Sequence, residues 1–349
     1  QEDPAASSVA VSMPVRSMMT GWEERFAHFM SDDFFGAGED DMVTFTSTGS
    51  EAVHLASRIA RAKTGRHLIA KAAGGYDGWY DEFRYGLVDS AEAERSNARP
   101  TNGDFTVFRV NDTADLEQLF ADHGSDLAAI LVEPMLGNAA CLVPDRAYFE
   151  QLSALAKQHG VMVIADEVMV GLRMGLRPVS EQLGLTADLM TMGKAIGSGL
   201  PVAAVLGTPD AFSVVENGQV GCYGTYQGNP VVSAAVIATL GYLEATGYDA
   251  YFDHGTRLQE GIRAAFAEAG ITVSTSGFSG AFSIWFADHV PTTYDQARGM
   301  LKREAVHFLY EELRRNGIVT LPSPWGRLFT SFAHGPREME LTVAAYAKA

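Results

Sequence analysis

The feature that most constrains the fold of this chain is a regular alternation of short apolar segments with longer helical patterns. Helical patterns lie between several of the apolar segments. Two of these patterns, residues 51–63 and 146–159, are followed by Gly65 and Gly160, and glycine commonly ends a helix. Most of the apolar segments lack polar alternation, as strands covered on both faces do; they are residues 42–46, 67–71, 105–110, 127–132, 161–165, 189–192 and 202–206. The order predicts an α/β domain whose mainly parallel sheet is flanked by helices.

The pattern changes after Pro230. Helices are expected near residues 230–245, 249–269 and 294–316 and from residue 337, with short strands over 271–274 and 281–286. We interpret this part as a smaller α+β C-terminal domain. The expected organisation is an N-terminal arm over residues 1–21 that is incomplete, a large domain over 22–240 and a small domain over 241–349.

Composition excludes several classes of function. The net charge is −17, from 43 acidic and 26 basic side chains, and such a surface repels phosphate backbones, so no nucleic-acid partner is expected. No apolar run approaches the roughly 18 residues of a membrane span, so no membrane partner is expected. Cys141 and Cys222 are far apart and the nine histidines form no HExxH motif, which indicates no metal site and fits a reducing cytoplasm. We therefore expect a cytoplasmic protein.

A lysine surrounded by glycines is the sharpest chemical signal. Lys194 follows an apolar segment within the string TMGKAIGSGLP, residues 191–201. The glycines leave its amine room, and a lysine in such a site can form a Schiff base with an aldehyde. By itself the string fits a surface lysine in a glycine-rich loop equally well.

A second signal is Asp166, at the end of the apolar string VMVIAD, residues 161–166. The carboxyl edge of a parallel sheet is where α/β proteins bind ligands, and a buried carboxylate there needs a cation. A protonated pyridine nitrogen is one such cation, and its protonation keeps a cofactor ring electron-poor. The alternative is an aspartate that caps the following turn.

Four weaker motifs accompany these two, and three of them lie at expected strand ends. The string STGSEA, residues 47–52, begins a helix whose free N–H groups suit a phosphate, or simply carries an ordinary N-cap. The string AGGYDGWY, residues 73–80, offers aromatic rings for stacking or for packing. Strings at residues 131–138 (LVEPMLGN) and 224–230 (GTYQGNP) complete the set.

Taken together, these six motifs resemble the class III aminotransferases of pyridoxal-phosphate (PLP) fold type I, with glutamate-1-semialdehyde aminomutase and related transaminases most similar. The resemblance extends from about Ser47 to the C-terminus. It implies that Lys194 is the internal-aldimine lysine and also moves the proton, and that Asp166 is the partner of the pyridinium nitrogen. The other implied cofactor contacts are Val168 and Tyr76 on the ring faces, Gly49, Ser50 and the second subunit's Thr225 at the phosphate, Asn138 near the phenolic oxygen, and Glu133. Trp79, Arg173 and Arg327 are candidates for substrate binding.

The implied activity is that of a homodimeric, PLP-dependent aminotransferase with shared active sites. It would move an amino group between an amine or amino acid and a keto acid by a ping-pong mechanism through the Lys194 aldimine. An alternative is an aminomutase of the glutamate-1-semialdehyde type, which completes both half-reactions on one substrate. A less favoured alternative is a non-catalytic PLP-fold binding protein, against which Lys194 and Asp166 argue.

Two positions depart from the family pattern. Gly326 stands where the aminomutases have a glutamate, which favours a transaminase. Asp77 stands where the family usually has a histidine, and the sequence offers no interpretation of it.

Overall fold

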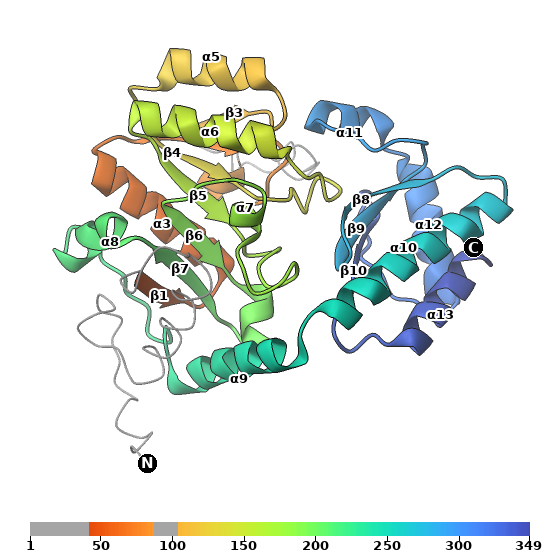
Figure 1. Ribbon diagram of the computed structural model, residues 1–349. Coiled ribbons are helices and arrows are strands. Elements are labelled where there is room, and N and C mark those ends of the chain that lie inside the picture. Colours follow the sequence, from red (N-terminus) through yellow and green to blue (C-terminus); the bar gives the residue numbers. More distant parts are fainter. Residues whose placement is uncertain (1–41, 85, 87–103) are drawn as a thin grey trace. The chain divides into compact units, whose positions relative to one another are not determined.

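The computed structural model describes residues 42–84, 86 and 104–349 (Figure 1). The expected N-terminal arm and residues 22–41 of the expected large domain lie outside them. The chain divides into two compact units. The first contains the described residues up to Pro134 together with Asp145–Thr246, and the second contains Met135–Pro144 and Gly247–Ala349.

A seven-stranded sheet forms the centre of the first unit, in the order β1-β7-β6-β5-β4-β2-β3. Adjacent strands from β3 to β6 are parallel, which confirms the expected mainly parallel sheet, whereas β7 is antiparallel to both β6 and β1. The strands are β1 (Met42–Thr46), β2 (Leu68–Ala72), β3 (Phe105–Phe108), β4 (Leu127–Val132), β5 (Met162–Asp166), β6 (Leu189–Met192) and β7 (Ala203–Gly207).

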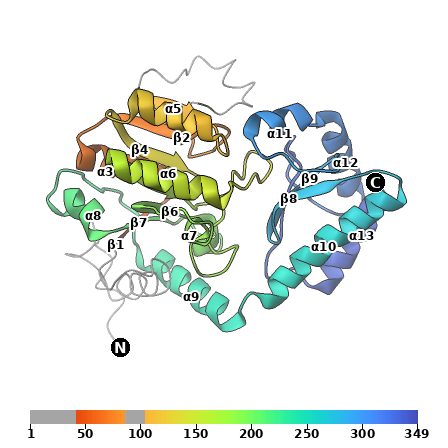
Figure 2. The same cartoon turned by 45° about the horizontal axis from the view of Figure 1, so that its top comes forward.

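Helices cover both faces of this sheet. In Figure 1, α6 (Arg146–His159) with α5 (Thr113–His123) lies in front of the sheet and α3 (Gly49–Thr64) behind it, and Figure 2 shows α6 from a second side. Helices α3 and α6 end at Gly65 and Gly160, both left-handed, as the sequence predicts. The remaining helices of the unit are α7 (Val179–Gln182), α8 (Pro209–Glu216) and α9 (Pro230–Thr246).

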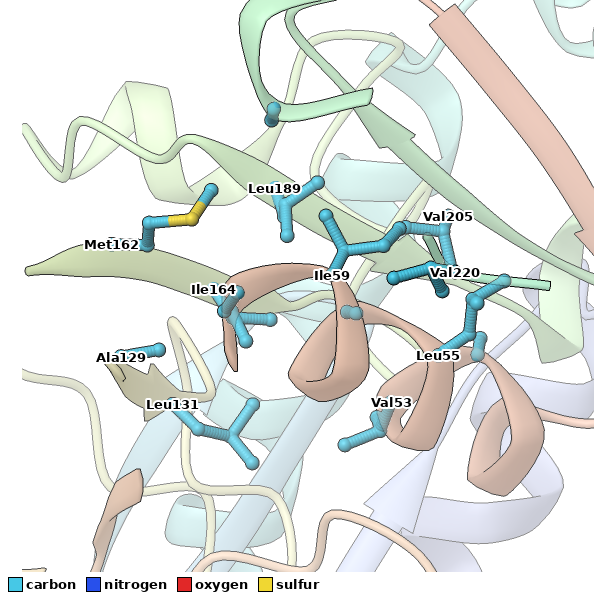
Figure 3. Close-up of a cluster of buried hydrophobic side chains, with 14 of the residues drawn as sticks. Val53, Leu55, Ile59, Ala129, Leu131, Met162, Ile164, Leu189, Val205 and Val220 are labelled. Atoms are coloured by element: carbon cyan, nitrogen blue, oxygen red, sulfur yellow. The ribbon is translucent and has the colours of Figure 1, made fainter. Parts of the chain in front are cut away.

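The core of the first unit lies between α3 and the sheet. Figure 3 shows Val53, Leu55 and Ile59 of α3 facing side chains of the central strands, among them Leu131 and Ile164. Each such buried aliphatic side chain contributes roughly 1.5–3 kcal/mol through the hydrophobic effect. This packing fixes the start of α3 against the edge of the sheet where the strands of the parallel set end.

The second unit has its own small core. Strands β8 (Ser274–Phe278), β9 (Ala281–Trp285) and β10 (Arg327–Phe329) form an antiparallel sheet in the order β10-β9-β8. Apolar side chains of β9 pack with those of three helices, which confirms the expected smaller α+β domain. The helices of the unit are α10 (Asp249–Glu268), α11 (Tyr294–Met300), α12 (Arg303–Arg315) and α13 (Pro336–Tyr346).

Several boundaries differ from the sequence predictions. The strand expected over residues 271–274 is instead β8, because Ile271 N–H closes the end of α10 on Phe266 O and the pairing with β9 starts at Ser274. The helix expected near 294–316 is two helices, since Leu301 has extended backbone. Met135–Pro144, expected in the large domain, belongs to the second unit, where Ser276 Oγ donates to Ala140 O (2.6 Å).

Within the described residues, no single helix is long and apolar enough to cross a membrane. Helices α9 and α10 reach the necessary length and hydropathy only when they are taken together across the break between them.

Candidate active site

A cavity of about 320 Å³ in the first unit brings together half of the predicted site residues, among them Lys194 and Asp166. It lies at the carboxyl edge of the sheet, where β1, β2, β5 and β6 end, and β7 begins at the same edge because it is antiparallel. This is the edge at which open α/β sheets bind ligands. The cavity is lined by Ser47, Thr48, Gly49, Ser50, Tyr76, Asp77, Gly78, Asp166, Val168, Lys194, Leu200, Pro201 and Val202.

The volume of a cavity does not identify the active site. A second, larger cavity of about 660 Å³ lies by the amino end of β5 and is lined by residues that include Thr64, Val161 and Asp188. None of the predicted site residues lines it.

Asp166 is a buried carboxylate with one oxygen held by the protein and one unused. Val168 N–H and Thr191 Oγ both donate to its Oδ1 atom, each at 2.9 Å, and Thr191 lies beside Asp166 in the register of β5 and β6. No hydrogen bond reaches Oδ2 from the described residues. Burial, and then the nearby charge of Asp77, raise the pKa of Asp166 to about 7, while Lys194 opposes the rise. Oδ2 is therefore the oxygen of this carboxylate that can accept a hydrogen bond from a cationic ligand.

Lys194 lies two residues after the end of β6 and begins a short 3₁₀ turn, Lys194–Gly197. Its side chain is exposed to the cavity edge, and its φ of +45° is in the left-handed region that non-glycine residues rarely adopt. Such strain persists where the surrounding structure imposes it, and it concentrates at functional sites. The preceding Gly193 packs closely on Val168, because a β-carbon there would lie 3.2 Å from Val168 Cγ1.

The N-terminus of α3 supplies an anion site. Thr48 caps the helix by accepting a hydrogen bond from Glu51 N–H (3.2 Å), and the Glu51 carboxylate accepts from Ser47 and Thr48 N–H. The N–H groups of Gly49 and Ser50 keep no acceptor among the described residues. Ser50 Oγ accepts from Trp79 N–H (3.2 Å), and no described residue accepts its own hydroxyl proton. Two N–H groups and one hydroxyl are thus available to a phosphate.

The side chains predicted for the two ring faces both line the cavity. Val168 packs so tightly under α3 that a β-carbon on Gly49 would lie 2.7 Å from its Cγ1 atom. Tyr76 is 41% exposed and keeps its ring at the cavity, while its N–H donates to Glu133 Oε1 (2.8 Å). Glu133 does not line the cavity and instead anchors the backbone of Tyr76.

The other predicted residues lie outside this cavity. Asn138 and Arg327 belong to the second unit, where Arg327 Nη1 donates to Asn138 Oδ1 and to Gly137 O (3.2 Å). Arg327 is the first residue of β10. Arg173 donates from Nε to Met169 O (2.8 Å). The side chains of Trp79 and Thr225 are exposed.

Two residues of the site were not identified by the sequence reasoning. Thr191 binds Asp166 across two strands, a contact that depends on strand register. Lys71 lies in β2 and forms a buried ion pair with Asp77, at 2.8 Å from Nζ to Oδ2. A lysine amid the apolar residues of a strand expected to be covered on both faces was the available signal for it.

Comparison with known proteins places this geometry in a family. The family model described as Aminotransferase class-III matches residues 5–287. The chain belongs to the class III aminotransferases. A curated member, the glutamate-1-semialdehyde 2,1-aminomutase of Thermoplasma volcanium, is 33% identical over 88% of this chain and 74% of its own length.

Solved structures of transaminases agree with the fold. An omega-transaminase from Sphaerobacter thermophilus superposes with a TM-score of 0.85 at 28% identity, over 100% of this chain and 82% of that one. A structure described as a transaminase with PLP bound gives 0.80 at 28% identity, over 99% and 80%. These comparisons confirm the expected family, its fold type and its PLP cofactor.

Proposed function

We propose that this class III aminotransferase is a PLP-dependent transaminase that moves an amino group between an amine or amino acid and a keto acid. The proposal rests on the residues that line the cavity. A lysine, a buried carboxylate with an unused oxygen and a helix N-terminus with unused donors line one space. These groups match the aldehyde, the pyridine nitrogen and the phosphate of PLP.

When bound, PLP supplies an electron-poor ring that stabilises negative charge at the substrate α-carbon. The protein then has three tasks. Asp166 Oδ2 would accept a hydrogen bond from the N–H of the pyridinium ring and keep that nitrogen protonated. Lys194 would hold the cofactor covalently, and its amine would move the proton at the substrate α-carbon. Gly49, Ser50 and the start of α3 bind the phosphate.

An aminomutase is the second candidate, because the curated relative from Thermoplasma carries that name. Gly326 supports the transaminase. Its φ is +60°, so the glutamate that aminomutases have there would have to adopt a left-handed backbone at some cost.

A keto acid separates the two candidates. The purified enzyme should be incubated with a panel of amine donors, with and without pyruvate or 2-oxoglutarate, while the cofactor absorbance is followed. A transaminase stops after converting its cofactor to the aminated form unless a keto acid is present. Sustained isomerisation of glutamate 1-semialdehyde without a keto acid would establish the aminomutase instead. Absence of turnover with every donor would leave the non-catalytic alternative.

The close contact between Gly49 and Val168 leads to a prediction about cofactor binding. Gly49→Ala places a methyl group 2.7 Å from Val168 Cγ1, so either the ring-face valine or the phosphate-binding turn must move. We expect PLP affinity to fall by about tenfold, equivalent to about 1.4 kcal/mol. Gly299→Ala is the matched control, because a β-carbon there meets nothing within 4 Å. Equal PLP affinity of the two variants, measured by titration of the cofactor-free protein, would contradict the close fit.

We also propose that the enzyme is a homodimer and that Thr225 binds the phosphate of the partner subunit. The segment from residue 221 to 246 carries large apolar side chains that are more than half exposed in the single chain: Tyr223, Tyr226, Val231 and Tyr242. Helix α9 has no charged residue before Glu244. A second copy of the chain is expected to cover this surface.

Charge on this surface should therefore dissociate the enzyme. Val231→Asp is expected to give a monomer with weakened PLP binding. The new carboxylate would be buried without a partner in the proposed dimer interface, which is costly. Val319→Asp is the control, since Val319 is 86% exposed and belongs to the second unit rather than to this segment. Sedimentation measures the assembly state. A wild-type monomer that stays fully active at high dilution would refute the shared site.

A further inference from the structure

Lys71 is a fully buried lysine that the proposed chemistry does not use. It lies in β2, has 0% exposed side-chain surface, and its strand neighbours Ile69, Ala70 and Ala72 are buried too. A buried ammonium is costly unless it is paired and hydrogen-bonded, so its retention requires partners. Its partners show what it holds in place.

All three partners of the ammonium belong to the segment that follows β2. Nζ donates to Gly75 O (3.1 Å) and to Phe83 O (2.5 Å), and it lies 2.8 Å from Asp77 Oδ2. The last contact is an ion pair rather than an aligned hydrogen bond, and Asp77 is itself only 1% exposed. The buried ammonium of Lys71 therefore holds three residues of the segment after β2 next to that strand.

The residue between two of those points is Tyr76, whose ring lines the cavity. Gly75 and Asp77 flank it in sequence, and its own N–H is held by Glu133 Oε1 at 2.8 Å. Beyond Asp77, Gly78 has a φ of +119° and packs on Ser50, where a β-carbon would come within 3.1 Å of Cα. The loop thus joins the ring site to the phosphate-binding turn.

We propose that Lys71 is a positioning residue whose ion pair with Asp77 fixes Tyr76 at the cofactor ring. The inference rests on the proposed function, because it requires PLP in this cavity. It accounts for the departure at residue 77, which the sequence left uninterpreted. A buried lysine at position 71 needs a counter-ion, and the aspartate supplies one where a histidine would not.

The test measures PLP binding and the spectrum of the bound cofactor, in addition to activity. Cofactor-free wild type, Lys71→Met, Tyr76→Ala and the double variant Lys71→Met/Tyr76→Ala are titrated with PLP well below their melting temperatures. The visible absorbance and circular dichroism of each complex are recorded. Lys63→Met is the matched control, because Lys63 pairs with Asp210 (2.6 Å) away from the cavity.

We expect Lys71→Met to lower PLP affinity about tenfold, a coupling of about 1.4 kcal/mol, and to change the circular dichroism of the bound cofactor. In the Tyr76→Ala background the same substitution should have little further effect, since the ring it positions is gone. Lys63→Met should bind as wild type does. If Lys71→Met does not fold, Lys71→Met/Asp77→Asn removes both buried charges and replaces it in the cycle.

Two results would overturn the inference. One is a folded Lys71→Met with wild-type affinity and circular dichroism. The other is an equal loss of affinity with and without the Tyr76 ring, which would indicate a general loss of structure. Failure of the proposed function has a different signature, since wild type itself would then bind no PLP or would bind it through another lysine.

Discussion

Replacing Lys194 by alanine is expected to reduce turnover by at least about 10⁴-fold, because one side chain supplies both the covalent attachment and the proton transfer. The fold should be unaffected. Lys194 is exposed, and alanine keeps the β-carbon that already accepts a φ of +45°. Steady-state rates and melting temperatures of the variant and wild type measure the two effects separately.

The attachment can be located chemically. Borohydride should bleach the visible band of the wild-type enzyme and leave a reduced cofactor adduct that peptide mapping places on Lys194. Lys157→Ala is the control, since Lys157 is an exposed lysine on α6. An adduct on any other lysine would show that Lys194 is a loop residue without this role.

Asp166→Asn is expected to retain PLP but to lower turnover by about 10²- to 10³-fold. The amide oxygen can keep the hydrogen bonds from Val168 and Thr191, so the local structure survives. The amide nitrogen would then occupy the place of Oδ2 and donate to the ring nitrogen, which leaves that nitrogen unprotonated. The absorbance spectrum of the variant shows whether PLP is still bound. Turnover close to that of wild type would show that Asp166 has only a structural role.

The same residue makes the stability of the cofactor-free enzyme depend on pH. Burial and the charge of Asp77 raise the pKa of Asp166 from 3.8 to about 7 in the folded chain. Between about pH 4 and pH 7 the folded state therefore binds more protons at this group than the unfolded state, so its contribution to stability falls as pH rises.

Thermal unfolding of the cofactor-free protein at pH 5 and pH 8 tests this sign. Asp166→Asn should be less sensitive to the change than wild type, and it should be relatively more stable at pH 8. An identical pH dependence of the two proteins would mean that Asp166 is ionised throughout this range.

Much of the first unit could be predicted from local sequence. The strands β1, β4 and β6 have the predicted bounds, because short runs of apolar residues between turn-forming residues are typical of strands covered on both faces. Gly65 and Gly160 end their helices because glycine adopts the left-handed backbone without a steric cost. Motifs at strand ends could be grouped in advance, because parallel strands end at one edge.

The contacts that complete the site depend on parts of the chain that are distant in sequence. The antiparallel β7 brings Leu200–Val202 to the cavity, and strand register places Thr191 against Asp166. In the second unit, Arg327 binds Asn138 across 189 positions of sequence, whereas the sequence assigned these two residues separate roles at substrate and cofactor.

The sequence by itself determined the alternation of strands and helices, the family and the two residues, Lys194 and Asp166, on which the proposed chemistry depends. These follow from local spacing and from residue type. Only the tertiary structure decided that Lys71 pairs with Asp77 and that Asp166 Oδ2 is left unused by the described residues. The physical reason is that burial sets the energy of a charge, and burial depends on the whole sheet and its covering helices.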